Sequence, residues 1–183
     1  MQSLSIDRKF SDLPLAITMG EPGGINSEIF LKAIKEVNKI KNFIICDPSW
    51  IEKSLKFFNK NMPINILDEN LNTKENYINI FPTKKNVIFK LGKPNKRNNN
   101  AIIESIDKAI YFAKNKKISG IVTLPIYKKN LIEDGFKFPG HTEYLSYIDN
   151  SEPLMILMNK KLKVATVTTH IPIKKISESL NKS

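Results

Sequence analysis

The two histidines of this 183-residue chain both stand in dense polar clusters, and the sequence contains no other histidine. His141 lies in the run GHTE at residues 140–143, and His170 lies in the run TTHIP at residues 168–172. Histidine is the most common metal ligand and the usual general base near neutral pH. A lone histidine is more often structural, but two in hydroxyl-rich clusters at the ends of regular elements favour binding or catalysis.

A metal site in this chain would need ligands other than histidine. A catalytic transition-metal site normally takes three protein ligands and leaves an open position for the substrate. With two histidines in total, carboxylate side chains or another chain must complete any such site.

Two further segments could hold an anion. The glycine-rich turn at residues 20–24 precedes a predicted helix and could cradle a phosphate at its N-terminus. However, it matches neither the Rossmann pattern nor the P-loop, so by itself it predicts only a tight turn. Lys128 could bind a phosphate or carboxylate of a substrate, although a single lysine among so many is more often solvated. The sequence does not separate Lys128 from its neighbour Lys129.

The pattern of apolar residues predicts alternating strands and helices in the first half of the chain. We expect a strand at 13–18, a helix capped by Asn26 or Ser27 and running to about residue 40, and a strand at 42–46. Asp47-Pro48 is a favourable helix start, because it places a capping carboxylate before a proline, and the helix should reach about residue 59.

The rest of the chain continues the alternation less regularly. We expect short strands at 64–67, 77–81 and 87–89, a loop at 93–100, a helix at 101–115 and a strand at 120–123. A short helix should follow His141, with strands at 154–157 and 164–167 and a last helix from about residue 173. This order indicates an α/β fold with a layered, mostly parallel sheet and flanking helices.

Ligands of such folds collect beyond the carboxyl ends of the strands. Four segments are expected at that edge: residues 19–27, 124–129, the 140–143 cluster and the 168–172 cluster. No repeat or linker marks an internal domain boundary in residues 1–183.

Composition narrows the classes of function. A hydrophobic content of 41% supports a globular core, and the sequence has neither an apolar run long enough to span a membrane nor a signal-like start. We therefore expect a cytoplasmic protein without a membrane partner. The net charge of +11 is spread along the chain and carried mostly by lysine, which argues against nucleic-acid binding. Cys46, the single cysteine, is expected to be a buried structural thiol.

Four ordered motifs resemble one enzyme family. The runs LAITMGEPGGI with Glu28, TLPIYK, FPGHTE and VATVTTHIP, beginning at residues 15, 123, 138 and 164, are similar to 4-hydroxythreonine-4-phosphate dehydrogenase of vitamin B6 (pyridoxal phosphate) biosynthesis. The resemblance covers the chain from Leu13 onward but only about the N-terminal half of the family's subunit. It implies a fold related to isocitrate and isopropylmalate dehydrogenases, apparently incomplete here, with the active site between two domains and at a homodimer interface.

The resemblance also implies roles for individual residues. His141 and Thr142 fall where the family binds its phosphorylated hydroxy amino acid, and His170 falls at the first of three histidines that hold a divalent metal such as zinc, magnesium or cobalt. The metal would assist oxidation of the substrate hydroxyl, with hydride passing to NAD or NADP, and then the loss of carbon dioxide. The other two metal histidines and most cofactor contacts lie beyond Ser183, so the catalytic residues are not identified within this chain.

The chain departs from the family pattern at two places. Asn26-Ser27 replaces the usual Gly-Pro, and Tyr127 replaces a smaller polar residue or histidine. We expect the isolated chain to be inactive, and to aggregate or to assemble as a homodimer or with a chain that carries the missing half. Two alternatives are a non-catalytic remnant or interaction module that binds a phosphorylated metabolite, and a related dehydrogenase of a phosphorylated sugar acid.

Overall fold

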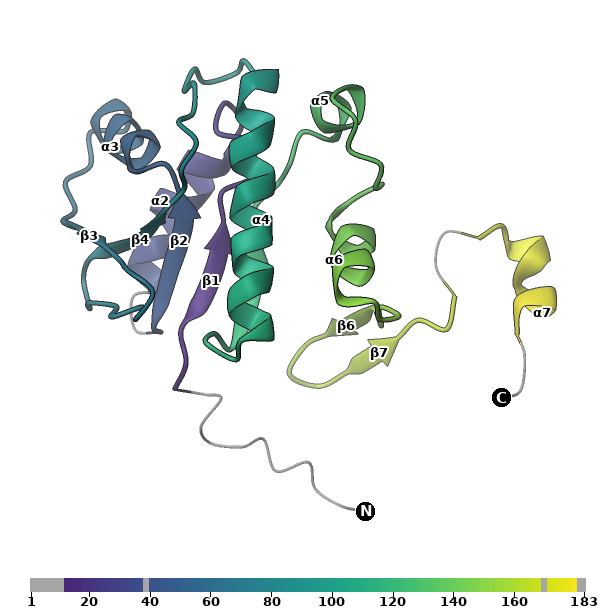
Figure 1. Cartoon of the computed structure of the whole chain (residues 1–183). Helices are drawn as coiled ribbons and strands as arrows, with labels where there is room; N and C mark the ends of the chain where they lie inside the picture. Colours follow the sequence, from purple (N-terminus) through teal and green to yellow (C-terminus); the bar gives the residue numbers. More distant parts are fainter. Residues whose placement is uncertain (1–11, 38–39, 169–170, 181–183) are drawn as a thin grey trace. The chain divides into compact units, whose positions relative to one another are not determined.

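The computed structural model describes residues 12–37, 40–168 and 171–180 (Figure 1). The chain divides into two compact units, residues 1–139 and residues 140–183.

The first unit is built on a five-stranded parallel sheet. Its strands are β1 (Leu15–Thr18), β2 (Asn42–Cys46), β3 (Ile64–Ile66), β4 (Ile78–Pro82) and β5 (Gly120–Thr123), in the order β3-β4-β2-β1-β5. The expected parallel α/β architecture is therefore confirmed for this unit. β1 lies between β2 and β5, so the segments that follow β1 and β5 leave the sheet side by side.

Helices cover both faces of this sheet. The helices are α2 (Asn26–Val37), α3 (Pro48–Phe57), α4 (Asn99–Lys114) and the short α5 (Lys128–Glu133), with a 3₁₀ turn at Lys96–Asn98 leading into α4. Figure 1 shows α4 across one face of the sheet and α2 across the other. The two helices lie on opposite faces because β1 connects to β2 in one direction along the sheet and β4 connects to β5 in the other.

The core of the first unit is aromatic and aliphatic. Phe112 of α4 packs edge-to-face against Phe43 of β2 and Phe81 of β4, with ring centroids 5.8 and 5.0 Å apart. Trp50 of α3 is completely buried. Every residue of β2 is buried, which is typical of a central parallel strand covered on both faces.

The start of α3 follows the sequence prediction. Asp47 caps the helix, its Oδ1 accepting from the Ser49 backbone N–H at 2.9 Å, with Pro48 in the first turn. Cys46, just before this cap, is buried as predicted. Burial, aided by the nearby Asp47 carboxylate, raises the pKa of the Cys46 thiol well above its ordinary value and so keeps the thiol protonated.

Two local predictions in the middle of the chain were wrong. Residues 87–89 form no strand, because side chains bind their backbone: Asp47 Oδ2 accepts from the Val87 N–H at 2.9 Å, and Asn98 Oδ1 accepts from the Ile88 N–H at 2.7 Å. The predicted loop at 93–100 ends early, since α4 begins at Asn99 after the 3₁₀ turn. The helix start was not predicted because it lies in an asparagine-rich run, and asparagine is more typical of loops and turns.

The second unit contains α6 (His141–Asp149), strands β6 (Ile156–Met158) and β7 (Lys163–Ala165), a 3₁₀ turn at Ile173–Lys175 and the single-turn α7 (Ile176–Ser179). β6 and β7 form an antiparallel two-stranded sheet of their own. The helix predicted after His141 is confirmed. The expectation that the 168–172 cluster follows a strand of the same parallel sheet as β1 was wrong, because β7 belongs to this separate hairpin.

Candidate functional site

A cluster of buried polar residues, the platform, lies where β1 and β5 end. It consists of Thr18, Glu21, Asn26, Ser27, Asn98 and Asn99. Gly20 adopts φ +63°, and a Cβ at this position would lie 2.5 Å from the Pro125 carbonyl oxygen, so only glycine fits. The Glu21 N–H donates to that same oxygen at 3.0 Å. The turn after β1 is therefore joined directly to the loop after β5. The sequence predicted that the segments 19–27 and 124–129 share this edge of the sheet, and the structure adds their contact.

Asn26 strengthens this joint. Its Nδ2 donates to the carbonyl oxygens of Glu21 at 2.9 Å and of Pro125 at 2.7 Å. Asn26 is buried as the first residue of α2. One of the two departures from the family pattern therefore has a structural role, because a glycine at this position could not make these side-chain hydrogen bonds.

Glu21 places a carboxyl group at the centre of the platform. Its side chain is 3% exposed, and its Oε1 accepts from the Gly23 N–H at 2.9 Å and from Asn98 Nδ2 at 3.2 Å. Desolvation by burial raises the pKa of Glu21, and the hydrogen bonds from Gly23 and Asn98 only partly oppose this rise. A carboxyl group in this position connects the turn after β1 to the segment that enters α4.

The sequence reasoning missed the two asparagines that start α4. Asn98 accepts from the Ile88 N–H and donates to the Ile88 carbonyl at 3.0 Å, as well as bonding Glu21. Asn99 Nδ2 donates to the Asn130 carbonyl at 3.1 Å and to Asp134 Oδ2 at 3.0 Å, which anchors α5. Their position in an asparagine-rich run resembled a solvated loop, and only their complete burial reveals the role.

Several buried oxygens of the platform accept no hydrogen bond from the described residues. They are Thr18 Oγ1, Glu21 Oε2, Asn26 Oδ1, Ser27 Oγ and Asn99 Oδ1. A buried oxygen that neither water nor a ligand satisfies costs about 1 to 3 kcal/mol. These atoms are therefore places where water or a polar ligand group would bind favourably.

Lys128 is the first residue of α5 and is exposed, and Tyr127 beside it is 41% exposed. The loop that carries both residues is tied to the platform through Pro125. Lys128 therefore projects from an element fixed by the first unit, as an anion-binding side chain would need to.

His141 and Thr142 are the first two residues of α6, in the second unit. Gly140, at the N-cap position, has an extended backbone and no side chain that could cap the helix. The N-terminus of α6 is therefore a place where backbone N–H groups and the positive end of the helix dipole favour an anion. His141 is half-buried and Thr142 is exposed.

His170 lies outside the described residues, so the structure gives no position for this predicted metal ligand. Within the described ranges, no group of three or more His, Cys, Asp or Glu side chains could hold a metal ion. The metal role of His170 stays a prediction.

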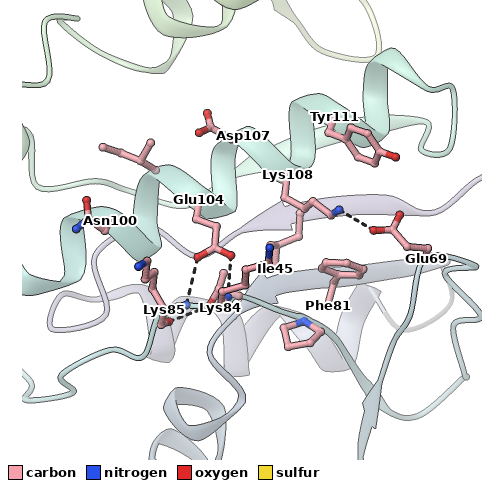
Figure 2. A pocket seen from close by; sticks show the side chains of 13 residues that line it. Ile45, Glu69, Phe81, Lys84, Lys85, Asn100, Glu104, Asp107, Lys108 and Tyr111 are labelled. Atoms are coloured by element: carbon pink, nitrogen blue, oxygen red, sulfur yellow. Dashed lines mark hydrogen bonds and ion pairs between the residues drawn. The ribbon is translucent and has the colours of Figure 1, made fainter.

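A groove of the first unit lies between α4 and β4, and no residue of the platform lines it (Figure 2). It encloses about 910 Å³, and Lys108 on its wall is 2.6 Å from Glu69 Oε1 and packs over the Tyr111 ring. Glu104 accepts hydrogen bonds from the Lys84 and Lys85 N–H groups. Lys128, the predicted anion-binding residue of the first unit, does not line this groove.

Comparison with known proteins decides the family. The model of the family described as "Pyridoxal phosphate biosynthetic protein PdxA" matches residues 38–183. The chain belongs to this family. A 4-hydroxythreonine-4-phosphate dehydrogenase of Sulfurihydrogenibium sp. is 34% identical over 174 residues, which are 92% of this chain and 53% of that protein. The corresponding protein of Wigglesworthia glossinidia brevipalpis is 32% identical over 171 residues, 91% of this chain and 52% of that protein.

Solved structures agree with this assignment. The structure of a putative 4-hydroxythreonine-4-phosphate dehydrogenase from Salmonella typhimurium superimposes with a TM-score of 0.82 at 26% identity, covering 92% of this chain and 55% of that one. The enzyme of Burkholderia phymatum gives 0.80 at 25% identity, with 89% and 52% covered. The PdxA-family fold expected from the sequence is therefore confirmed, and the chain spans about half the length of the relatives it matches.

No helix within the described ranges is long and apolar enough to cross a membrane.

Proposed function

We propose that this chain supplies the first half of a 4-hydroxythreonine-4-phosphate dehydrogenase of pyridoxal phosphate biosynthesis. The observation that carries the proposal is the match of at least nine-tenths of the chain to curated dehydrogenases of that name, at up to 34% identity. The reaction would be the oxidation of 4-phosphooxy-threonine with NAD or NADP, followed by decarboxylation, in the cytoplasm. This reaction requires the part of the family's fold that lies outside the region matched by this chain.

The residues of the second unit would bind the substrate phosphate. His141 and Thr142 occupy the first turn of α6, where backbone N–H groups and a hydroxyl can receive phosphate oxygens. A glycine at the N-cap leaves this end open to a ligand, because no capping side chain competes for the helix N–H groups.

The first unit would add charge and rigidity. Lys128, at the start of α5, offers an ammonium group to an anionic substrate. The hydrogen bonds of Asn26 to Glu21 and Pro125 hold the loop that leads to Lys128, which limits the conformational entropy lost on binding.

Metal and cofactor binding belong to the assembled enzyme. His170 would contribute one metal ligand, and the remaining ligands and most nicotinamide contacts would come from the second half, in a homodimer or in a complex with another chain.

The test is NADH formation from 4-phosphooxy-threonine with a divalent metal, followed at 340 nm. We expect no turnover from the 183-residue chain alone, and turnover once a second half of a PdxA-family protein is joined to it. In the joined protein, Thr142→Ala should raise KM for the phosphorylated substrate, whereas Ser146→Ala, on the same helix, should leave KM unchanged. A joined protein that is folded but inactive would contradict the proposal.

The alternative is a non-catalytic role in binding a phosphorylated metabolite, which the N-terminus of α6 would support because Gly140 leaves its backbone N–H groups without a capping side chain. Calorimetry separates the two functions. Heat of binding with phosphorylated hydroxy acids, together with persistent inactivity of the joined protein, would support the binding role. Phosphorylated sugar acids, offered as substrates in the NADH assay, test the related dehydrogenase activity.

A further inference from the structure

A second groove of the first unit lies between α3 and the segment 89–91. It encloses about 760 Å³, and small-molecule sites usually have volumes of about 300 to 1,000 Å³. Its lining residues are Lys53, Lys56, Phe57, Phe89, Lys90 and Leu91. None of these residues belongs to the platform, and the sequence analysis assigned none of them a role.

One wall of this groove is an exposed face of α3. The buried face of the helix consists of Trp50, Ile51, Ser54 and Leu55. Lys53, Lys56 and Phe57 are exposed, and because residues three and four apart on a helix are neighbours, their side chains form one patch. Phe57 is 64% exposed, and its ring packs edge-to-face against Phe58 with the centroids 5.0 Å apart. A large ring that the core does not bury is therefore presented beside two ammonium groups.

The opposite wall is held at both ends. The Val87 N–H donates to Asp47 Oδ2 at 2.9 Å, and the Gly92 N–H donates to the Gly23 carbonyl at 2.8 Å. Asp47 also caps α3, because its Oδ1 accepts from the Ser49 N–H at 2.9 Å. One carboxylate thus connects the two walls. A groove that is fixed in this way loses little conformational entropy when a ligand binds.

Three lysines give the groove a positive charge. Among the residues that the structure describes, no acidic side chain lines the groove, and no ion pair involves Lys53, Lys56 or Lys90. Glu52, the neighbour of Lys53 on α3, is exposed and is not part of the lining. Charge complementarity therefore favours an anionic ligand.

The lining also indicates the rest of the ligand. A phosphate monoester carries a charge of about −1.5 to −2 and three acceptor oxygens, which suits three ammonium groups better than the single charge of a carboxylate. The rings of Phe57 and Phe89 offer apolar faces on which a planar ring can stack.

We infer that the groove between α3 and residues 89–91 binds a small planar aromatic phosphate. Two sources share this chemistry: a nucleoside monophosphate and a phosphorylated pyridine ring. This binding is independent of the proposed dehydrogenase function.

Calorimetric titration of the 183-residue chain with adenosine monophosphate and with pyridoxine phosphate tests both sources. Pyridoxine phosphate is an alcohol, and it replaces the corresponding aldehyde because aldehydes form imines with lysines. Adenosine, pyridoxine and inorganic phosphate separate the ring from the anion. We expect at least one of the two aromatic phosphates to bind at least about tenfold more tightly than its own ring and than inorganic phosphate. The tighter of the two identifies the source.

Two variants test the two parts of the recognition. Phe57→Ala removes the exposed ring and Lys56→Gln removes one charge, and each should weaken binding by at least about fivefold. Lys35→Gln, on the exposed face of α2, removes the same charge outside the groove and should bind like the unaltered chain. Emission from Trp50 without ligand confirms that each variant is folded, because this side chain is completely buried.

Other results would overturn the inference. If neither aromatic phosphate gives heat, the groove has no such ligand. If inorganic phosphate or the ring alone binds as tightly, the groove recognises charge or apolar surface only. Binding that survives Phe57→Ala and is lost in Lys128→Gln would place the ligand at the predicted substrate site instead. Failure of the NADH assay would contradict the proposed function and leave this groove as a binding site.

Discussion

The two units of this chain differ in how far they bury their apolar side chains. In the first unit, a five-stranded sheet with helices on both faces buries Phe43, Trp50 and Phe112. In the second unit, the apolar residues of β6 and β7 remain in water. The comparison shows that apolar composition alone does not make a folding unit. Strands are stabilised only when connected elements return over their faces, as α2 and α4 do for β1 and β2.

The largest difference between the units is expected in the free energy of unfolding when large apolar side chains are replaced by alanine. Phe43→Ala removes a completely buried ring that contacts Phe112, and should lower the free energy of unfolding by about 3 to 5 kcal/mol. Leu157→Ala, in the exposed hairpin, should change it by no more than about 0.5 kcal/mol. Urea titrations followed by Trp50 fluorescence and far-UV circular dichroism measure both. Equal costs would show that the hairpin shares the core of the first unit.

The sequence could predict those parts of the fold that depend on local patterns. Strands 42–46 and 120–123 were predicted to the residue, because short runs that are rich in β-branched and apolar residues and lie between polar segments favour strands. The strand predicted at 87–89 was wrong, since Asp47 and Asn98, distant in sequence, bind its backbone. Local patterns carry no information about such partners.

The candidate site was predicted in part for the same reason. The placement of the turn at 20–24 and the loop at 124–129 at one edge of the sheet followed from the parallel α/β pattern. Their direct contact depends on β1 and β5 being neighbours, which the sequence did not predict. The burial of Glu21, Asn98 and Asn99 did not, because polar residues in polar runs resemble solvated loops until their neighbours are known. The binding roles of Lys128, His141 and Thr142, and the metal role of His170, remain predictions.

A second contrast lies within the first unit, between two glycines with positive φ. Gly20→Ala should cost about 2 to 4 kcal/mol, because the left-handed backbone is strained and the new Cβ meets the Pro125 carbonyl oxygen at 2.5 Å. Gly92→Ala has a similar φ of +72° but no atom within 4 Å of its Cβ, and should cost only about 1 kcal/mol. Thermal unfolding of the two variants gives the comparison, and equal costs would argue against the close joint between the β1 and β5 loops.

The platform should also respond to pH. Burial raises the pKa of Glu21 above 4.5, so the folded state binds this proton more readily than the unfolded state. The contribution of Glu21 to stability is therefore fully present below pH 4.5 and is lost as the pH rises through the folded-state pKa. Glu21→Gln removes this dependence, so the stability of the variant should fall less than that of the unaltered chain between pH 4.5 and 7.

Chemical unfolding at a series of pH values measures the effect. Glu36→Gln, on the exposed face of α2, is the control and should follow the curve of the unaltered chain. Parallel curves for Glu21→Gln and the unaltered chain would exclude a buried, proton-binding Glu21.

The smallest effect is expected on the solvated surface of the first unit. Lys32 and Glu28 form an i,i+4 ion pair of 2.7 Å on α2, with the lysine side chain 76% exposed. Glu28→Gln should cost no more than about 0.5 kcal/mol and less at high salt. A larger loss in urea titrations at low and high ionic strength would mean that surface charge, in addition to the core, stabilises this unit.

The most direct test of the difference between the units is native-state hydrogen exchange of the 183-residue chain by itself. We predict that amides of β2, residues 42–46, exchange only by global unfolding of the first unit, while amides of the hairpin, residues 156–165, exchange through local opening at a small fraction of that free energy. Equal protection of the two segments in the isolated chain would contradict the account, because it would show that residues 140–180 need no second half to fold.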